Sequence, residues 1–110
     1  MAKDDYFVMA YKLLKYLYDC LKKGKKPETE KIKHNTKHFP VGEEYFNYLL
    51  ETLTRDGYLR NVIVIDMDNE TFVNFSEDIQ ITPKGIEYLE ENSMMKKIAN
   101  GIKDIGGLLT

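Results

Sequence analysis

The stretch Ile81–Asn92, ITPKGIEYLEEN, changes from strand-forming to helix-forming sequence within three residues. The β-branched Ile81 suits the end of a strand, and Thr82 is a residue type that caps helix N-termini. Pro83 fits the first helical position, where its missing N–H would have had no partner. Gly85 has no side chain, so another backbone segment can approach the new helix closely. The stretch therefore predicts an abrupt junction between a strand and a helix.

Two strands are predicted just before this junction, with a helix before them. Residues 58–66 are rich in Val and Ile, which is typical of a strand. A second strand is predicted over residues 71–75, TFVNF, and its continuation over residues 78–81, DIQI, is left open. The sequence MDNE between them, residues 67–70, predicts the turn of a hairpin. Upstream, apolar residues at helical spacing predict a helix over residues 42–56, which ends at Gly57. Its expected buried side chains are Phe46, Leu49, Leu50 and Leu53.

The first third of the chain predicts one long helix and one short helix. The long helix covers residues 5–23, and steps of three and four place its apolar side chains on one face. These side chains are Phe7, Ala10, Leu14, Leu17 and Leu21, and the face is widened by Tyr6, Val8 and Leu13. Cys20 lies among apolar residues at helical spacing, so we expect it to be buried. The short helix is expected over residues 27–34, with Ile32 as its one strong apolar anchor.

A last amphipathic helix is predicted over residues 93–110. Its apolar stripe consists of Met94, Ile98, Ile102, Ile105 and Leu109. An apolar stripe of this kind is expected to be buried against another surface. Two interpretations of what buries it remain open. The helix packs on the first helix of the same chain, or it pairs with the same helix of another copy. In the second case the partner-binding residues are Met94, Ile98, Ile102 and Ile105.

The predicted order is three helices, a β-hairpin and two C-terminal helices. This order is the α+β winged helix-turn-helix arrangement, and we expect residues 1–110 to form one such domain. The chain resembles the YjcQ-like family in three stretches and in the trailing helix. The three stretches are YKLLKYLYDCLKKGK, YFNYLLETLTRDGYL and ITPKGIEYLEEN. That resemblance implies a small winged-helix protein of Gram-positive bacteria and their prophages. It implies no catalytic residues.

Composition and charge limit the environment of the chain and the kinds of partner. One cysteine excludes an internal disulfide, no apolar run approaches the ~20 residues of a membrane span, and the N-terminus is unlike a signal peptide. We therefore expect a cytoplasmic protein without a membrane partner. Residues 22–38 hold seven lysines against two glutamates, a net charge of +5. Residues 39–92 hold three basic residues against twelve acids, a net charge of −9.

The sequence offers no convincing catalytic or metal-binding pattern. His34 and His38 lie four residues apart, but Asn35 stands where a zinc-protease motif needs glutamate. Three alternating acids at positions 66, 68 and 70 lack the glycine of a calcium loop, because Thr71 occupies its position. No nucleophile pattern or glycine-rich phosphate loop is present. We therefore expect no enzymatic activity, no metal and no cofactor.

A winged helix that binds DNA usually inserts its third helix into the major groove. Here that helix begins with Glu43 and Glu44, and the hairpin tip is also acidic. Our first expectation for function is nevertheless a DNA-binding, transcriptional-regulator-like protein. Because the third helix and the hairpin tip are acidic, we predict that double-stranded DNA contacts the basic segment between the first and third helices. Its candidate residues are Lys25, Lys26, Lys31, Lys33, His34, Lys37 and His38. The alternative hypothesis is a protein-interaction module that does not bind DNA and that pairs with itself or with another protein.

Overall fold

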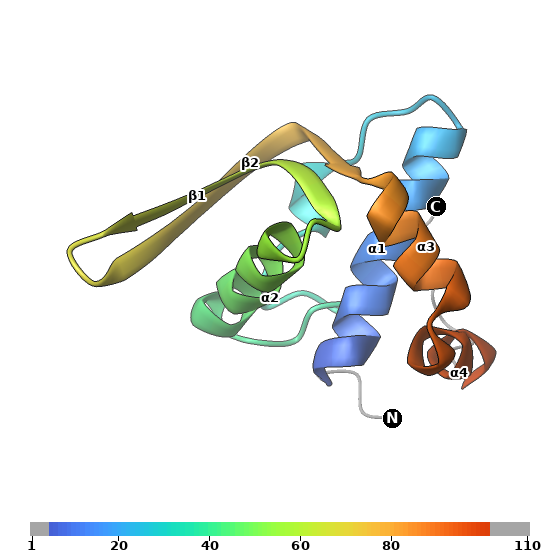
Figure 1. The fold of residues 1–110 in the computed structure, drawn as a ribbon. Helices are drawn as coiled ribbons and strands as arrows, with labels where there is room; N and C mark the ends of the chain where they lie inside the picture. Colours follow the sequence, from blue (N-terminus) through green and yellow to red (C-terminus); the bar gives the residue numbers. More distant parts are fainter. Residues whose placement is uncertain (1–4, 102–110) are drawn as a thin grey trace.

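The computed structural model describes residues 5–101, which fold into an α+β arrangement of helices around one β-hairpin (Figure 1). The helices are α1 (Tyr6–Lys22), α2 (Glu43–Arg55), α3 (Pro83–Glu91) and α4 (Ser93–Gly101). The hairpin consists of β1 (Leu59–Met67) and β2 (Glu70–Ile81), which pair antiparallel. Figure 1 shows the helices gathered around α1, while the far end of the hairpin projects away from them.

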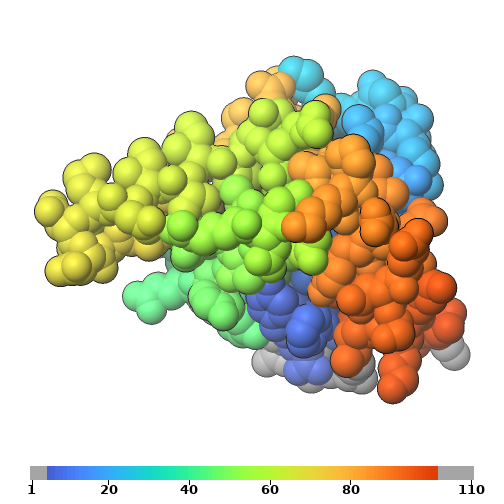
Figure 2. Space-filling view, in the orientation of Figure 1, coloured from blue at the N-terminus to red at the C-terminus, as the bar shows by residue number. Residues whose placement is uncertain are grey.

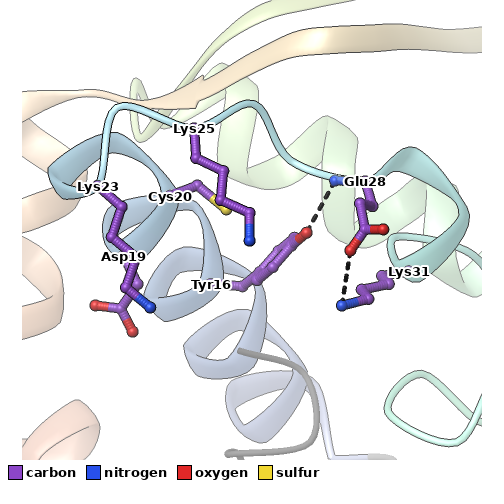
Figure 3. A pocket seen from close by; sticks show the side chains of 7 residues that line it. All are labelled: Tyr16, Asp19, Cys20, Lys23, Lys25, Glu28 and Lys31. Atoms are coloured by element: carbon purple, nitrogen blue, oxygen red, sulfur yellow. Dashed lines mark hydrogen bonds and ion pairs between the residues drawn. The ribbon is translucent and has the colours of Figure 1, made fainter. Parts of the chain in front are cut away.

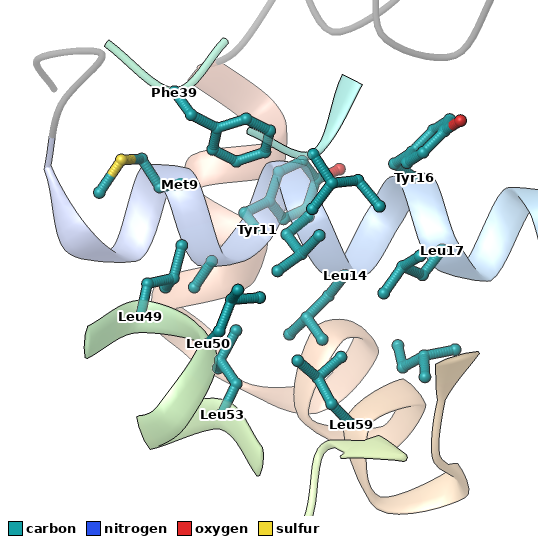
Figure 4. Close-up of a cluster of buried hydrophobic side chains, with 14 of the residues drawn as sticks. Met9, Tyr11, Leu14, Tyr16, Leu17, Phe39, Leu49, Leu50, Leu53 and Leu59 are labelled. Atoms are coloured by element: carbon teal, nitrogen blue, oxygen red, sulfur yellow. The ribbon is translucent and has the colours of Figure 1, made fainter. Parts of the chain in front are cut away.

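Helix α1 is the centre of the hydrophobic core. It contacts α2, α3, α4 and β2, and Met9, Leu13 and Leu14 are fully buried. Figure 4 shows α1 side chains pointing both toward α2 and toward the opposite side, where Phe39 lies. The prediction of a single apolar face was therefore wrong at two positions, because Phe7 and Leu21 are more than 40% exposed. A central helix is buried on several sides, which a one-face pattern does not represent.

The short helix predicted over residues 27–34 is wrong in extent. Only Thr29–Lys31 form a helical turn, and it is a 3-10 turn. The rest of the loop is fixed by tertiary contacts: the Glu28 backbone N–H donates to the Tyr16 hydroxyl at 2.8 Å, and Ile32 is buried as expected. A segment with one apolar anchor gains little from extending its helix, since helix stability in proteins comes mainly from a packed face.

The junction between β2 and α3 has the predicted geometry. The Thr82 hydroxyl accepts a hydrogen bond from the Gly85 backbone N–H at 3.0 Å and donates to the Gly57 carbonyl at 2.6 Å. Pro83 occupies the first turn of α3. A Cβ atom at Gly85 would lie 2.5 Å from the Tyr58 carbonyl oxygen, so the predicted close approach of two backbones is confirmed.

The hairpin has a two-residue turn and a large bulge. Asp68 and Asn69 both have positive φ, as a type I′ turn requires, within the predicted turn segment. Val62 pairs with Phe75 and Arg60 pairs with Gln80, so Asn61 alone opposes residues 76–79. The Asn61 side chain fills this bulge by donating to the Asp78 carbonyl at 2.7 Å. The bulge separates the base of the hairpin from residues 62–75, which we name the hairpin arm.

Helix α4 packs within the chain. Met95 is fully buried and Ile98 is 3% exposed, and α4 contacts both α1 and α3. The assignment of Ile98 to a partner surface was therefore wrong, and the interpretation of packing within the chain holds for this residue. Met94 remains 37% exposed. Ile102, Ile105 and Leu109 lie outside the described residues.

The close approach at Gly85 generates a stability prediction. We expect Gly85→Ala to lower the free energy of unfolding by about 1–3 kcal/mol, because the new Cβ meets a backbone oxygen that cannot rotate away. Urea unfolding followed by circular dichroism measures the change. The control is Gly101→Ala, since a Cβ there has open space around it and alanine is the better helix former. Equal stabilities of the two variants would contradict the steric explanation.

Candidate functional site

The predicted DNA-contacting lysines lie in the connection between α1 and α2, but acids of the same chain neutralise some of them. The Lys26 ammonium lies 3.2 Å from an Asp78 carboxylate oxygen and 3.4 Å from a Glu77 oxygen. The hydrogen bond with Asp78 raises the pKa of Lys26 above its ordinary value. The Lys31 ammonium lies 2.8 Å from a Glu28 oxygen, and that hydrogen bond raises the pKa of Lys31. Lys31 therefore pairs within the loop, whereas Lys26 connects the loop to the base of the hairpin.

Other lysines of the segment keep their charge available. In the described part of the chain, Lys23, Lys25 and Lys33 are exposed and form no ion pair. Figure 3 shows the Lys25 side chain folded back toward Tyr16, beside the hydrogen bond between Glu28 and the Tyr16 hydroxyl. The available positive charge is therefore smaller than the sequence count suggests.

The two histidines of the segment have different neighbours. The His34 Nε2 atom lies 3.8 Å from a Glu43 carboxylate oxygen, and the Lys12 ammonium donates to the His38 carbonyl at 3.4 Å. Lys37 is exposed at the surface of the same loop. Across residues 5–101, no group of three His, Cys, Asp or Glu side chains is placed to hold a metal ion.

Helix α2 uses its arginine to hold the hairpin arm. The Arg55 guanidinium donates to both Asp66 carboxylate oxygens, at 2.8 and 2.9 Å, and to a Glu51 oxygen at 2.9 Å. The hydrogen bonds from Arg55, followed by one from Thr71, lower the pKa of Asp66 below its ordinary value. The exposed first turn of α2 carries Glu43 and Glu44. On the side of α2 next to the arm, the arginine is therefore already paired with carboxylates and is not available to bind DNA phosphates.

The outer face of the hairpin arm is apolar and uncovered. Ile63, Ile65, Met67 and Phe72 point to this face and are 47–55% exposed. Ile65 and Phe72 lie directly opposite each other on the two strands. The inner face carries Val62, Val73 and Phe75, which are partly buried against the core. We use the name outer arm face for the surface formed by Ile63, Ile65, Met67 and Phe72.

The sequence contained a signal for this surface that our site assignment did not use. Residues 62–65, VIVI, are apolar at four consecutive positions, so both faces of the strand are apolar. A strand of this kind is normally covered on both faces. In a two-stranded hairpin beside α2, one face lies toward the core and the other remains open to solvent (Figure 1).

Comparison with known proteins gives a family. A family model described as YjcQ protein matches residues 11–107, nearly the whole chain, which confirms the resemblance seen in the three sequence stretches. No curated protein and no solved structure matches the chain. None of the helices in residues 5–101 has the length and hydrophobicity needed to span a membrane.

The contact between Arg55 and Asp66 predicts a measurable titration. We expect the carboxyl pKa of Asp66 to lie below 3.8 and to rise toward that value in Arg55→Gln. A lowered folded-state pKa means that the ion pair stabilises the fold above the ordinary carboxyl pKa and that this stabilisation is lost as pH falls through the lowered value. The pKa of the Asp66 carboxyl is measured by following its carboxyl carbon signal by NMR as the pH is lowered. Arg60→Gln is the control, and an equal pKa of Asp66 in both variants would contradict the assignment.

Proposed function

The chain belongs to the YjcQ family, and we propose that it is a winged-helix protein-interaction module whose partner binds the outer arm face. The winged-helix assignment is supported by the order of α1, the 3-10 turn, α2, the hairpin and α3. In this assignment the 3-10 turn takes the place of the second helix and the hairpin arm is the wing. The role is one of binding, in the cytoplasm and in a phage-related setting, without catalysis.

One observation carries this proposal. Four large apolar side chains occupy one face of a projecting arm, and each keeps about half of its surface exposed. Contiguous apolar surface of this kind on a folded protein commonly marks an interaction site. A wing that contacts DNA instead needs Lys or Arg for the phosphates. Residues 59–81 contain five acids and a single basic residue, Arg60.

The charges around the outer arm face indicate the chemistry of the partner. Glu70 lies opposite Met67 at the tip of the arm, and Asp68 lies in the turn beside it. Acids at the rim of an apolar surface favour a partner that carries Lys or Arg around an apolar centre. They also disfavour the stacking of two identical arms, because the same acids would meet.

Double-stranded DNA, the first expectation from the sequence, is the second candidate partner. It is supported by Lys23, Lys25 and Lys33, which are exposed without an ion pair in the described part of the chain. Their position between α1 and α2 is the one expected for DNA contact outside the acidic helix. The ion pairs of Lys26 and Lys31 reduce the positive field available to this candidate.

Site-specific photo-crosslinking tests the proposed docking surface. We expect benzoylphenylalanine at position 72 to give one discrete protein adduct in cells that naturally produce the chain. The same probe at position 96, exposed on α4, is expected to give none. Adding Ile65→Thr to the position-72 probe is expected to lower the adduct yield about tenfold, the equivalent of ~1.4 kcal/mol.

The pattern of adducts decides between outcomes. A partner of another sequence supports the proposal, and an adduct of the chain with itself means that the partner is a second copy. Equal adducts from positions 72 and 96, or a yield unaffected by Ile65→Thr, would contradict docking on the outer arm face.

Fluorescence anisotropy with random duplex DNA tests the second candidate. We expect binding at 150 mM salt to be weaker than the ~10⁻⁴ to 10⁻⁶ M typical of non-specific DNA-binding proteins. Tighter binding that falls steeply with salt would favour the DNA function. In that case the double variant Lys25→Glu, Lys33→Glu is expected to abolish binding, and Lys96→Glu, Lys97→Glu on α4 serves as the matched charge control.

A further inference from the structure

A groove lined mainly by aromatic side chains lies where the start of α1, helix α2 and helix α3 meet. Figure 2 shows these three elements, in blue, green and orange, adjoining on the face turned to the viewer. The residues that line the groove are Tyr6, Phe7, Tyr45, Tyr48, Thr52, Leu53, Asp56, Tyr58 and Tyr88. Six of these nine side chains are aromatic, and one is a carboxylate.

The rings of this groove hold one another in place. Tyr58 and Tyr88 are stacked, with centroids 4.4 Å apart and an angle of 7° between their planes. Tyr6 meets Tyr48 edge to face at 6.2 Å, and Tyr45 lies 6.5 Å from Tyr48. Tyr48 is nevertheless 57% exposed, so much of its ring surface remains free to contact another molecule.

The electrostatic environment of the groove is negative. In the described part of the chain, the exposed Asp56 carboxylate has no ion-pair partner. Asp56 is also the C-cap of α2, where the helix dipole adds partial negative charge. The pKa of Tyr6 is raised to about 12, first by burial and then by repulsion from Tyr88, when that phenol is ionised, and from Asp56. A cation entering the groove would meet ring faces and a carboxylate that has no ion-pair partner among the described residues.

We propose that this groove binds an arginine side chain of a partner protein. A guanidinium group is planar, so it can donate paired hydrogen bonds to the Asp56 carboxylate. The apolar stem of the same arginine can lie along the rings that line the groove between Asp56 and the exposed Tyr48. Lysine offers the charge but not the planar, two-pronged contact with a carboxylate. A cation already lies near the neighbouring ring surface, where the Lys84 ammonium is 5.6 Å from the Tyr58 centroid. This site does not depend on the outer arm face.

The test compares arginine with its neutral isostere. The probe is the blocked peptide Gly-Gly-Arg-Gly-Gly, and the control peptide carries citrulline in place of arginine. Both are titrated into ¹⁵N-labelled protein at 150 mM salt. We expect the arginine peptide to shift the amide signals of residues 52–58 and 88, and the citrulline peptide to bind about tenfold more weakly, since it lacks the charge.

Two variants with the same loss of charge locate the site. Asp56→Asn is expected to reduce the affinity for the arginine peptide to that for the citrulline peptide. Asp68→Asn, at the hairpin tip, is expected to leave the affinity unchanged. At Tyr48, which is exposed enough to be replaced without loss of core packing, alanine is expected to weaken binding and phenylalanine to retain it.

Several results would overturn the proposal. These are equal affinities of the two peptides, an unchanged affinity in Asp56→Asn, or an equal loss in Asp68→Asn. Concentration-dependent shifts of the groove signals without peptide, abolished by Asp56→Asn, would assign the groove to a second copy of the chain and overturn it as well. The peptide titration and the crosslinking at position 72 probe different surfaces, so the result of one does not determine the result of the other. Failure of the arginine site can therefore be distinguished from failure of the proposed docking surface.

Discussion

The hydrogen bonds of Thr82 hold three parts of the chain at one point. The Thr82 side chain bonds the Gly57 carbonyl and the first turn of α3, and its backbone N–H donates to the Tyr58 carbonyl at 3.0 Å. The end of α2, the start of β1 and the start of α3 are therefore fixed relative to one another. Gly85 is required because α3 passes too close to Tyr58 for any side chain. The hairpin and the aromatic groove both take their positions from this junction.

The charges of the chain largely serve to hold its own elements together. Lys26 connects the loop after α1 to Glu77 and Asp78 in the bulged base of the hairpin, and Arg55 connects α2 to Asp66 in the arm. The basic segment and the acidic segment are thus partly complementary to each other within one molecule. Besides the exposed lysines of the loop after α1, the surfaces that these ion pairs leave uncovered include the apolar arm face and the aromatic groove, which are the two surfaces proposed above for protein partners.

The elements that the sequence predicted well are those with a local chemical reason. Thr82, Pro83 and Gly85 act within one turn, and the hairpin turn depends on two adjacent residues, so their neighbours in sequence are their neighbours in space. The stripe of α4 was wrong at one described residue, because Met95 is buried beside Ile98 whereas Met94 is 37% exposed. Spacing of four from Ile98 selected Met94, but spacing of three, which selects Met95, is equally helical. The pairing of Lys26 with Asp78 joins residues 52 positions apart, which no local pattern reveals.

The exposed outer arm face affects how much of the protein can remain unassociated in a cell. Each strand of the two-stranded sheet has one edge without a neighbouring strand, and the outer arm face lies between those edges. Exposed apolar strands associate with similar strands as concentration rises, whereas the acids at the tip oppose that association. The balance sets an upper limit on the amount of free chain that stays dispersed. Covering of the outer arm face by the proposed partner would raise that limit.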